Sequence, residues 1–159
     1  MTNSPPTNIG VISDTHGLLR PEAVAALRGS QAIIHAGDVG RQEILAALEQ
    51  IAPVTAVRGN IDTAPWARRL PVTNVLEADG STIYVLHNVD ELDLDPVAAG
   101  FDAVIFGHSH RPLIEWRNGV LFFNPGSAGP RRFNLPISMG WLLLDQGKLT
   151  AELIELKTS

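Results

Sequence analysis

The stretch Ile9-Gly-Val-Ile-Ser-Asp-Thr-His16 decides the fold, because an apolar run stops there at two side chains that can bind metal ions. Apolar runs that end in Gly, Asp or His are typical of strands buried on both faces of an α/β sheet. In such sheets the ligand crevice lies beyond the carboxyl ends of the strands. We therefore expect Asp14 and His16 to point into a functional crevice.

Similar runs occur further along the chain and end in the same kinds of side chain. The residues reached in this way are Asp38, Asn60, His87, His108 and His110. His108 and His110 stand two positions apart, as Asp14 and His16 do, so each pair can project to one side of an extended chain. Glycines directly precede Asp38, Asn60 and His108, where they let the backbone turn sharply and approach a bound ion.

Strands and helices are predicted to alternate in the first part of the chain. The expected segments are a strand at 9–13, a helix at 21–29, a strand at 32–35, a helix at 42–50 and a strand at 53–57. This order indicates a parallel βαβαβ unit. The second part is expected to contain a short helix at 94–99, a strand at 102–106 and three hairpins, which span 72–86, 111–123 and 137–155. Two packed sheets with helices on the outside are the simplest architecture.

The composition describes an ordinary globular chain of 159 residues, with 45% apolar and 18% charged residues. We expect a flexible leader at 1–7 and a single domain at 8–159. No apolar run approaches the roughly 18 residues that cross a membrane, and no secretory signal is recognised. The net charge of −5, without a basic block, argues against non-specific binding of nucleic acid or of anionic membranes. The absence of cysteine excludes disulfides and thiolate ligands and is compatible with the cytoplasm, the expected location.

The candidate ligands are Asp, His and Asn side chains, a mixed oxygen and nitrogen set that suits Mn²⁺, Fe, Co, Ni or Zn better than Ca²⁺. Two such ions typically lie about 3.5–4 Å apart, generate a hydroxide at neutral pH and bind the phosphoryl oxygens during displacement. Each residue alone would be a weak indication, because a lone His at a strand end is more often structural and a lone Gly-Asp is usually a turn. The order and strand context that all seven share favour a two-metal hydrolase.

These motifs resemble those of the calcineurin-like metallophosphoesterase superfamily, and especially of its small single-domain phosphodiesterases from bacteria and archaea. In this sequence they are Asp14-Thr-His16, Gly37-Asp38, Gly59-Asn60, His87 and Gly107-His108-Ser-His110. The likeness covers roughly residues 8–155 and includes the loop Asn124-Pro-Gly-Ser127. It implies an α/β fold, a four-layer αββα sandwich of two mixed sheets flanked by helices.

The resemblance also implies a set of roles for the candidate residues. Two divalent metal ions would be bound, with Mn²⁺ first and Ni²⁺, Fe, Zn²⁺ and Co²⁺ as alternatives. One ion would be held by Asp14, His16, Asp38 and His110. The other would be held by Asp38, Asn60, His87 and His108, so that Asp38 bridges the two. The residues expected to act in catalysis are Asp38, Asn60 and His87, and Asn60 is also expected to bind substrate.

The function implied is that of a metal-dependent phosphoesterase, which hydrolyses small phosphodiesters with a hydroxide that bridges the two metals. The alternative is a protein-interaction scaffold that resembles the small retromer subunit of the same superfamily. Scaffold relatives have lost metal-ligand histidines, whereas all seven ligands are present here. Arg131 and Arg132 are candidates for binding the substrate phosphate, and a solvated pair of loop residues is the plainer alternative. A homo-oligomer is left open.

Some residues depart from the family pattern or lie outside it. Larger phosphatases of the superfamily place a His directly after the Asn ligand, where it would protonate the leaving group. Here Ile61 and Asp62 follow instead, as in other small members. Asn88 follows His87 where relatives often have Gly, which removes no ligand. His35 lies inside its predicted strand and matches no ligand position, so a hydrogen-bonded core histidine is expected.

Overall fold

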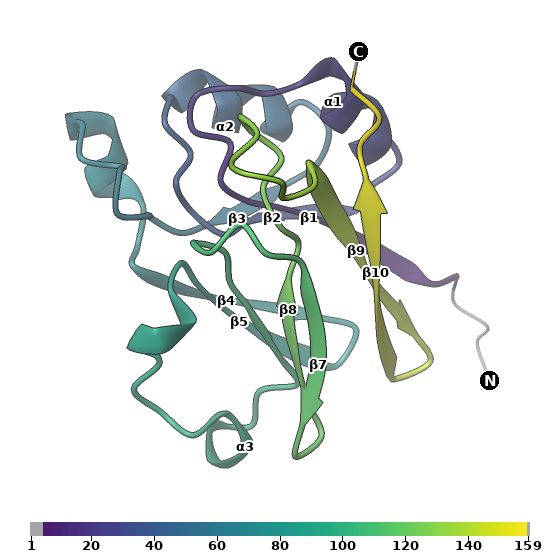
Figure 1. Cartoon of the computed structure of the whole chain (residues 1–159). Coiled ribbons are helices and arrows are strands. Elements are labelled where there is room, and N and C mark those ends of the chain that lie inside the picture. The colour runs from purple at the N-terminus through teal and green to yellow at the C-terminus, as the bar shows by residue number, and fades with distance from the viewer. Residues whose placement is uncertain (1–4, 159) are drawn as a thin grey trace.

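Two five-stranded sheets face each other in the structure, a computed structural model that describes residues 5–158 (Figure 1). The first sheet has the order β10-β9-β1-β2-β3. Its strands are β1 (Thr7–Ile12), β2 (Ala32–His35), β3 (Val54–Ala56), β9 (Ser138–Asp145) and β10 (Lys148–Glu155). The second sheet has the order β4-β5-β6-β8-β7. Its strands are β4 (Thr73–Ala78), β5 (Ser81–Leu86), β6 (Ala103–Ile105), β7 (Leu113–Arg117) and β8 (Val120–Asn124).

Both sheets are mixed and have a parallel core. Strands β1, β2 and β3 run parallel, and β9 and β10 add an antiparallel pair at one side. Strands β5, β6 and β8 also run parallel, between the antiparallel edge strands β4 and β7. Within each parallel set the carboxyl ends of the strands lie along one edge of the sheet, which is where the predicted ligands follow.

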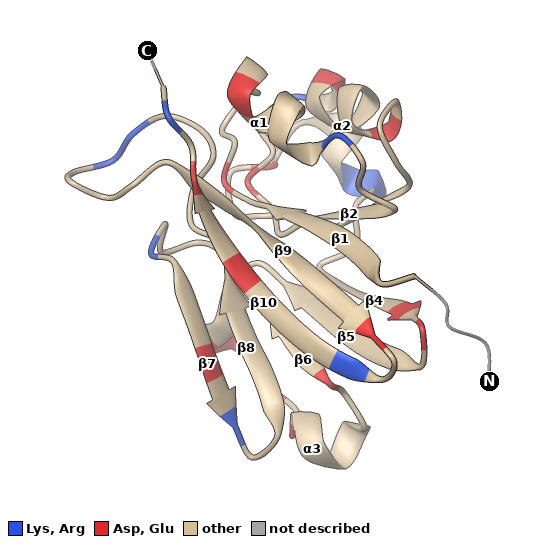
Figure 2. Cartoon of the chain, turned by 90° about the vertical axis from the view of Figure 1, so that its right-hand side faces the viewer, with Lys and Arg blue, Asp and Glu red and all other residues tan. Residues whose placement is uncertain are grey.

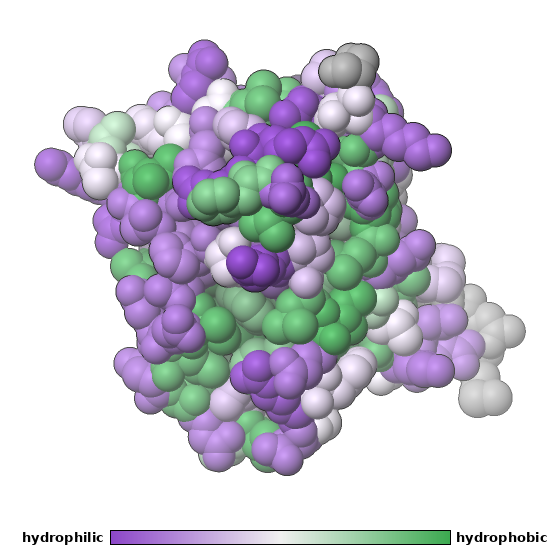
Figure 3. All heavy atoms as spheres, in the orientation of Figure 1, coloured by the Kyte–Doolittle hydropathy of each residue, from purple (hydrophilic) through white to green (hydrophobic). Residues whose placement is uncertain are grey.

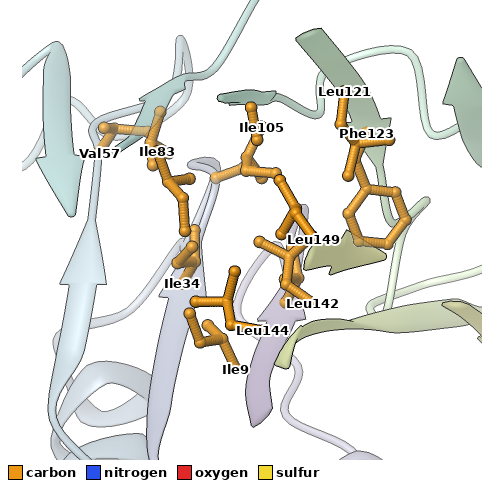
Figure 4. Close-up of a cluster of buried hydrophobic side chains, with 14 residues drawn as sticks. Ile9, Ile34, Val57, Ile83, Ile105, Leu121, Phe123, Leu142, Leu144 and Leu149 are labelled. Atoms are coloured by element: carbon orange, nitrogen blue, oxygen red, sulfur yellow. The ribbon is translucent and has the colours of Figure 1, made fainter. Parts of the chain in front are cut away.

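The main core lies between the two sheets and is built from alternate residues of their strands. Figure 4 shows Ile9, Ile34, Leu142 and Leu144 of the first sheet opposite Ile83, Ile105, Leu121 and Phe123 of the second. All of these side chains are buried. Burial of each one contributes about 1.5–3 kcal/mol to the stability of the fold.

Helices α1 (Pro21–Leu27) and α2 (Gln42–Glu49) cover the outer face of the first sheet. Pro21 suits the first helical position, because its missing N–H would find no partner there. In α2, Ile44 and Leu48 stand four residues apart and are both buried, as one apolar helix face requires. They pack with Ile12 and Ile33, which lie on the helix side of β1 and β2. Both strands are therefore buried on both faces, as predicted.

The outer face of the second sheet is covered mainly by irregular chain. The segment between β5 and β6 contains only a 3₁₀ turn, η2 (Val89–Glu91), and the short helix α3 (Pro96–Ala99). Its side chains cover Tyr84, Val104 and Phe122 of the sheet. The predicted αββα order of layers is confirmed, although the second helical layer is thin, since the connection between β5 and β6 holds only η2 and α3.

A few local details differ from the sequence predictions. The 3₁₀ turns η1 (Pro65–Arg69) and η2 were not anticipated, since such short turns carry no apolar period. Helix α3 begins at Pro96 because the Asp95 side chain accepts a hydrogen bond from the Val97 N–H and caps the helix there. Of the expected leader at 1–7, residues 1–4 lie outside the described residues, and Thr7 already belongs to β1. Among the described helices, none is both long and apolar enough to span a membrane.

Candidate metal centre

All seven predicted ligands lie in loops that follow the parallel strands. Asp14 and His16 follow β1, Asp38 follows β2 and Asn60 follows β3. His87 follows β5, and His108 and His110 follow β6. The strand ends of the two sheets meet at this point, since the His108 N–H donates a hydrogen bond of 3.1 Å to Asp14 Oδ2. The cluster therefore spans both sheets.

One oxygen of Asp14 is fixed by hydrogen bonds and the other faces histidines. Oδ2 accepts a bond of 2.7 Å from the Ser13 hydroxyl in addition to the bond from His108. Oδ1 lies 3.4 Å from His110 Nε2, 3.6 Å from His16 Nε2 and 3.9 Å from His87 Nε2. These separations exceed those of normal hydrogen bonds. Oδ1 is thus left available at the centre of the cluster.

Asp38 is arranged in the same way. Its Oδ1 accepts a hydrogen bond of 3.0 Å from the Ile61 N–H. Its Oδ2 lies 3.2 Å from His87 Nε2 and 3.5 Å from His16 Nε2. Since His16 and His87 are expected to bind different ions, this oxygen lies where a bridging ligand would be needed.

His87 is held in a defined protonation state by the backbone. Its Nδ1 lies 2.7 Å from the Ala36 carbonyl oxygen, so this nitrogen carries the proton and donates. The lone pair of the neutral ring is therefore on Nε2, which faces Asp38. His108 Nδ1 lies 3.3 Å from His87 Nε2 and 3.2 Å from Asn60 Oδ1. Asn60 and His108 thus complete the second half of the cluster.

The donors form two groups that can each hold a cation. Within each group one ligand atom per residue lies within 4.8 Å of the others. The groups are Asp14, His16 and His110, and Asp38, His87 and His108. Four buried atoms have no hydrogen-bond partner in the described part of the chain: Asp14 Oδ1, His16 Nε2, His110 Nδ1 and His110 Nε2. Buried polar atoms are rarely left unsatisfied, so these residues fit divalent metal ions of the kind that the donor set favours.

Burial and neighbouring groups shift the pKa values of the ionisable side chains in the cluster. Burial opposes ionisation of Asp14, but the neighbouring His110 and His16 side chains outweigh it and hold the pKa of this carboxyl well below its usual range. Burial likewise opposes ionisation of Asp38, and the neighbouring His87 together with the hydrogen bond from the Ile61 N–H lowers its pKa. Burial disfavours a charged His87, yet Asp38 and Asp14 raise its pKa. The carboxylates therefore stay ionised, and protons compete with metal ions for His87.

Five of the seven candidate ligands have left-handed backbone conformations. Their φ angles are 54° for Asp14, 47° for His16, 55° for Asp38, 71° for His108 and 62° for His110. Non-glycine residues in this region cost of order 1 kcal/mol or more each and cluster at functional sites. Such turns direct each side chain into the crevice directly after its strand has ended.

Two glycines allow the ligand loops to approach one another closely. A Cβ atom at Gly59 would overlap the carboxylate and backbone of Asp38. A Cβ atom at Gly107 would overlap the side chains of Ser13 and Asp14. Glycine at these two positions lets the ligand loops pack tightly against each other, and the approach of the backbone to a bound ion stays a prediction.

Asp62 stabilises the loops that carry the candidate ligands and is not positioned to donate a proton to a leaving group. It is buried and accepts hydrogen bonds from the backbone N–H groups of Val39, Gly40 and Gly59, at 2.9–3.1 Å. These bonds tie the loop after β2 to the loop after β3. Its acceptor capacity is used in holding Asp38 and Asn60 in place.

His35 is a buried core histidine, as predicted. Its Nδ1 accepts a hydrogen bond of 3.1 Å from the Gly37 N–H. Its Nε2 lies 3.0 Å from the Thr15 hydroxyl, which donates its own proton to the Val39 carbonyl. Nε2 must therefore be the protonated nitrogen, and the ring is neutral. Burial lowers the pKa of His35 to about 4.

We expect this neutral histidine to make the metal-free fold sensitive to acid. The unfolded chain protonates His35 near pH 6.5, whereas the folded protein does so only near pH 4. Its stabilising contribution is thus complete above pH 6.5 and is lost as the pH falls toward 4. Between pH 7.5 and 5 the free energy of unfolding should fall by about 2 kcal/mol from this residue alone.

Urea unfolding of metal-free protein at both pH values measures this loss. His35→Asn provides the comparison, because its amide oxygen can still accept from Gly37 while the group no longer titrates. The variant should lose about 2 kcal/mol less than the wild type over the same pH interval. Equal losses in both proteins would show that His35 is not the group responsible.

Asn124 is a supporting residue that sequence reasoning placed only within a family loop. It ends β8, is fully buried, and its amide donates to the Gly107 carbonyl and the Ser109 hydroxyl. Its own oxygen accepts from the Gly126 N–H. These bonds hold the loop that carries His108 and His110. The sequence feature that could have identified Asn124 is its position at the end of a strand, which it shares with the candidate ligands.

Arg131 and Arg132 were predicted to bind the substrate phosphate, and within its described residues the structure shows no hydrogen bond or ion pair between them and the ligand cluster. Arg131 and Arg132 are exposed, and the Arg131 guanidinium donates to the Leu135 carbonyl. Figure 2 shows the Lys and Arg residues of the visible side at separate places rather than in one stripe. A hollow beside Asn60, His87 and His108 is lined by a different arginine, Arg58. A substrate role for Arg131 and Arg132 stays a prediction.

Comparison with protein families places this sandwich among the metallophosphoesterases. The chain belongs to the calcineurin-like phosphoesterase superfamily, whose domain profile matches residues 8–147. A probable metallophosphoesterase of Methanothermobacter thermautotrophicus is 36% identical over 158 residues, which cover 92% of this chain and 91% of that protein. Phosphodiesterase YfcE of Escherichia coli K12 is 28% identical over 160 residues, which cover 82% of this chain and 84% of that protein.

Solved structures share the fold over nearly the whole chain. An archaeal phosphodiesterase superposes with a TM-score of 0.80 at 24% identity and covers 94% of this chain and 100% of its own. Vps29 from Entamoeba histolytica, solved as a complex with Zn²⁺, gives a TM-score of 0.70 at 22% identity, with coverages of 94% and 99%. At these identities the likeness concerns the fold alone.

Proposed function

We propose that this protein is a metal-dependent phosphodiesterase with two cations in one centre. The observation that carries the proposal is the set of four buried, unpartnered donor atoms in the described cluster, beside two ionised carboxylates. Structural histidines and carboxylates would have found hydrogen-bond partners within the protein. The family and the phosphodiesterase relatives support the same reaction class.

The two groups of donors support an assignment of ligands to each cation. Asp14, His16 and His110 would hold the first, and Asn60, His87 and His108 the second, with Asp38 shared by both. Mn²⁺ is the ion that we expect first. When bound, the cations would supply a hydroxide nucleophile at neutral pH and stabilise negative charge on the phosphoryl oxygens.

The protein's own residues limit which esters can be hydrolysed. Ile61 is 41% exposed and stands directly after Asn60, where larger relatives carry a histidine. It has no proton to donate, and Asp62 accepts hydrogen bonds from three backbone N–H groups. The leaving oxygen therefore departs without a positioned acid, an aid typically worth 10²–10⁴-fold in rate. Esters with good leaving groups, such as aryl diesters, should be preferred.

We predict that bis(p-nitrophenyl) phosphate is hydrolysed with a higher kcat/KM than p-nitrophenyl phosphate, because the diester carries one negative charge fewer into a centre with two carboxylates. Ile61→His should narrow this gap, because a protonated imidazole beside Asn60 favours the additional negative charge of the monoester. Both substrates are compared on both proteins after loading with Mn²⁺. Ile61→Val provides the control for a change of side chain without an acid. Both substrates release p-nitrophenolate, so a wild type that favours the monoester would contradict the preference for diesters.

A protein-interaction scaffold is the second candidate function. Exposed hydrophobic side chains favour it, among them Trp116 and Ile114 on β7 and Leu153 on β10. Figure 3 shows hydrophobic surface on the side of these strands, to the right of its centre. A measurement of metal binding cannot distinguish an enzyme from a scaffold, because the structure of a Vps29 has been solved in complex with Zn²⁺.

Turnover decides between the enzyme and the scaffold. The purified protein is loaded in turn with Mn²⁺, Ni²⁺, Fe²⁺, Zn²⁺ and Co²⁺, its metal content is measured, and aryl phosphodiesters are offered. We expect two ions per chain and hydrolysis that a chelator abolishes. Protein that binds metal but hydrolyses no activated diester with any of these ions would favour the scaffold.

A further inference from the structure

A hollow of about 340 Å³ opens beside the second half of the metal centre. Asn60, His87 and His108 form one part of its lining. The rest extends over β5 and the turn η2, and we call this part the side pocket. The residues of the side pocket that matter here are Arg58, Val72, Tyr84, Leu86, Glu91 and Asp93. A volume of this size lies at the lower end of the range for small-molecule sites.

Three charged side chains line the side pocket, and none of them forms an ion pair within residues 5–158. They are Arg58, Glu91 and Asp93. Elsewhere in the chain neighbouring charges do pair, as Arg117 does with Glu115 at 2.8 Å. The side pocket thus presents one guanidinium and two carboxylates to whatever enters it.

Tyr84 lines the side pocket with a polar group that the described part of the protein does not use. The side chain is only 7% exposed, and its ring is stacked on Phe101 with the centroids 4.7 Å apart. Its hydroxyl makes no hydrogen bond to any residue that the structure describes, and it is not one of the fully buried atoms that lack a partner. The hydroxyl is therefore accessible to a group that enters the side pocket, and a ligand there would supply a hydrogen-bond partner.

The charges indicate what kind of ligand this is. A phosphodiester carries one negative charge, and Arg58 can pair with it, since guanidinium matches phosphoryl oxygens. Glu91 and Asp93 then remain without a counter-charge, beside the Tyr84 hydroxyl and the apolar surface of Val72 and Leu86. A short alcohol that ends in an ammonium group would pair its charge with the two carboxylates, donate a hydrogen bond to the tyrosine oxygen and place its carbon chain on the apolar surface.

We propose that the side pocket binds one of the two ester groups of the substrate and selects an amino alcohol there. This inference rests on the proposed phosphodiesterase function and adds the class of substrate. The ammonium group would donate hydrogen bonds to Glu91, Asp93 and the Tyr84 oxygen, and the carbon chain would lie against Val72 and Leu86. Arg58 would contact the phosphoryl group.

Three p-nitrophenyl phosphodiesters of similar length test the selection by charge. Their second ester groups are 2-aminoethyl, propyl and 2-carboxyethyl, which differ in charge but little in size. With Mn²⁺-loaded protein, kcat/KM for the 2-aminoethyl ester should exceed that for the propyl ester by about tenfold, as hydrogen bonds between charged groups suggest. The 2-carboxyethyl ester should be the poorest of the three.

Variants show which residues make the selection. In Glu91→Gln/Asp93→Asn the ratio of the 2-aminoethyl to the propyl ester should fall to about one. Tyr84→Phe should lower the same ratio in part and leave the ring in place. Asp145→Asn/Glu152→Gln, at exposed positions of β9 and β10, serves as a control of equal charge change and should keep the wild-type ratio.

Binding of the products gives a readout that does not require turnover. Calorimetry should show that phosphoethanolamine binds the Mn²⁺-loaded protein more tightly than propyl phosphate, and that this difference disappears in Glu91→Gln/Asp93→Asn. Equal binding of the two, or a preference that survives the double variant, overturns the amino alcohol. Hydrolysis of all three diesters at equal rates overturns it as well and leaves the phosphodiesterase standing. Absence of any hydrolysis counts against the proposed function, and the calorimetry then still decides the selection.

Discussion

Asp38→Asn should abolish phosphodiester hydrolysis and lower the metal content of both halves of the centre. Asp38 Oδ2 lies within 3.5 Å of both His16 Nε2 and His87 Nε2, so it faces both groups of donors. An amide in its place carries no charge and is a poor bridge between two cations. We expect the rate to fall by about 10³-fold or more, which corresponds to about 4 kcal/mol of transition-state stabilisation.

The measurement combines metal analysis with steady-state kinetics on bis(p-nitrophenyl) phosphate. Asn still offers an oxygen to the Ile61 N–H, so the loop should keep its shape, which circular dichroism can verify. Asp145→Asn makes the same chemical change at the exposed end of β9 and should retain full activity and two metal ions. Near-native turnover in Asp38→Asn would refute the shared-ligand assignment.

His87→Ala should remove one metal ion and leave the other bound. His87 belongs to the group with Asp38 and His108, whereas Asp14, His16 and His110 form the other group. Its Nε2 is kept free for a cation by the bond from Nδ1 to the Ala36 carbonyl. Loss of the second cation removes part of the charge stabilisation, so we expect a fall in rate of about 10²-fold or more.

Metal content per chain separates this result from general unfolding. The variant should hold about one ion and keep its thermal transition, since His87 lies at the end of β5 and not between the sheets. His35→Ala is the informative comparison, because it removes a buried histidine that is not expected to bind metal. That variant should lose stability and keep two ions. Loss of both ions in His87→Ala would show that the two halves do not bind independently.

Much of this centre could be predicted from the sequence because its signals are local. The apolar run before Asp14 predicts a buried strand, and a parallel sheet then fixes where the next residue must lie. The same reasoning located Asp38 and His108 without any knowledge of distances. The family resemblance supplied the remaining step, which was to divide the ligands into two groups.

The supporting residues could not be predicted because their roles depend on contacts between distant loops. Asp62 is an ordinary acid in the sequence, and only the folded chain brings three backbone N–H groups to its carboxylate. Tyr84 is predicted from the sequence as a core residue of a strand, and nothing in the neighbouring sequence shows that it would line a hollow. Over the second sheet the short helix near 94–99 was predicted, whereas the turn η2 and the irregular chain beside it were missed because they have no period to detect.

The left-handed ligands have a consequence for how such a protein changes over evolutionary time. Asp14, His16 and His108 hold backbone conformations that glycine adopts at less cost, and Asp14 also places a carboxylate in a buried position. Mutation of these residues to glycine would relieve the backbone strain, and at Asp14 also the burial of charge, so selection for turnover alone keeps these side chains where they are. If selection for turnover is relaxed, we expect substitutions at these positions to accumulate and to give a more stable fold that binds no metal. A descendant that has lost the reaction and acquired another function would then differ from this chain by substitutions that stabilise the fold.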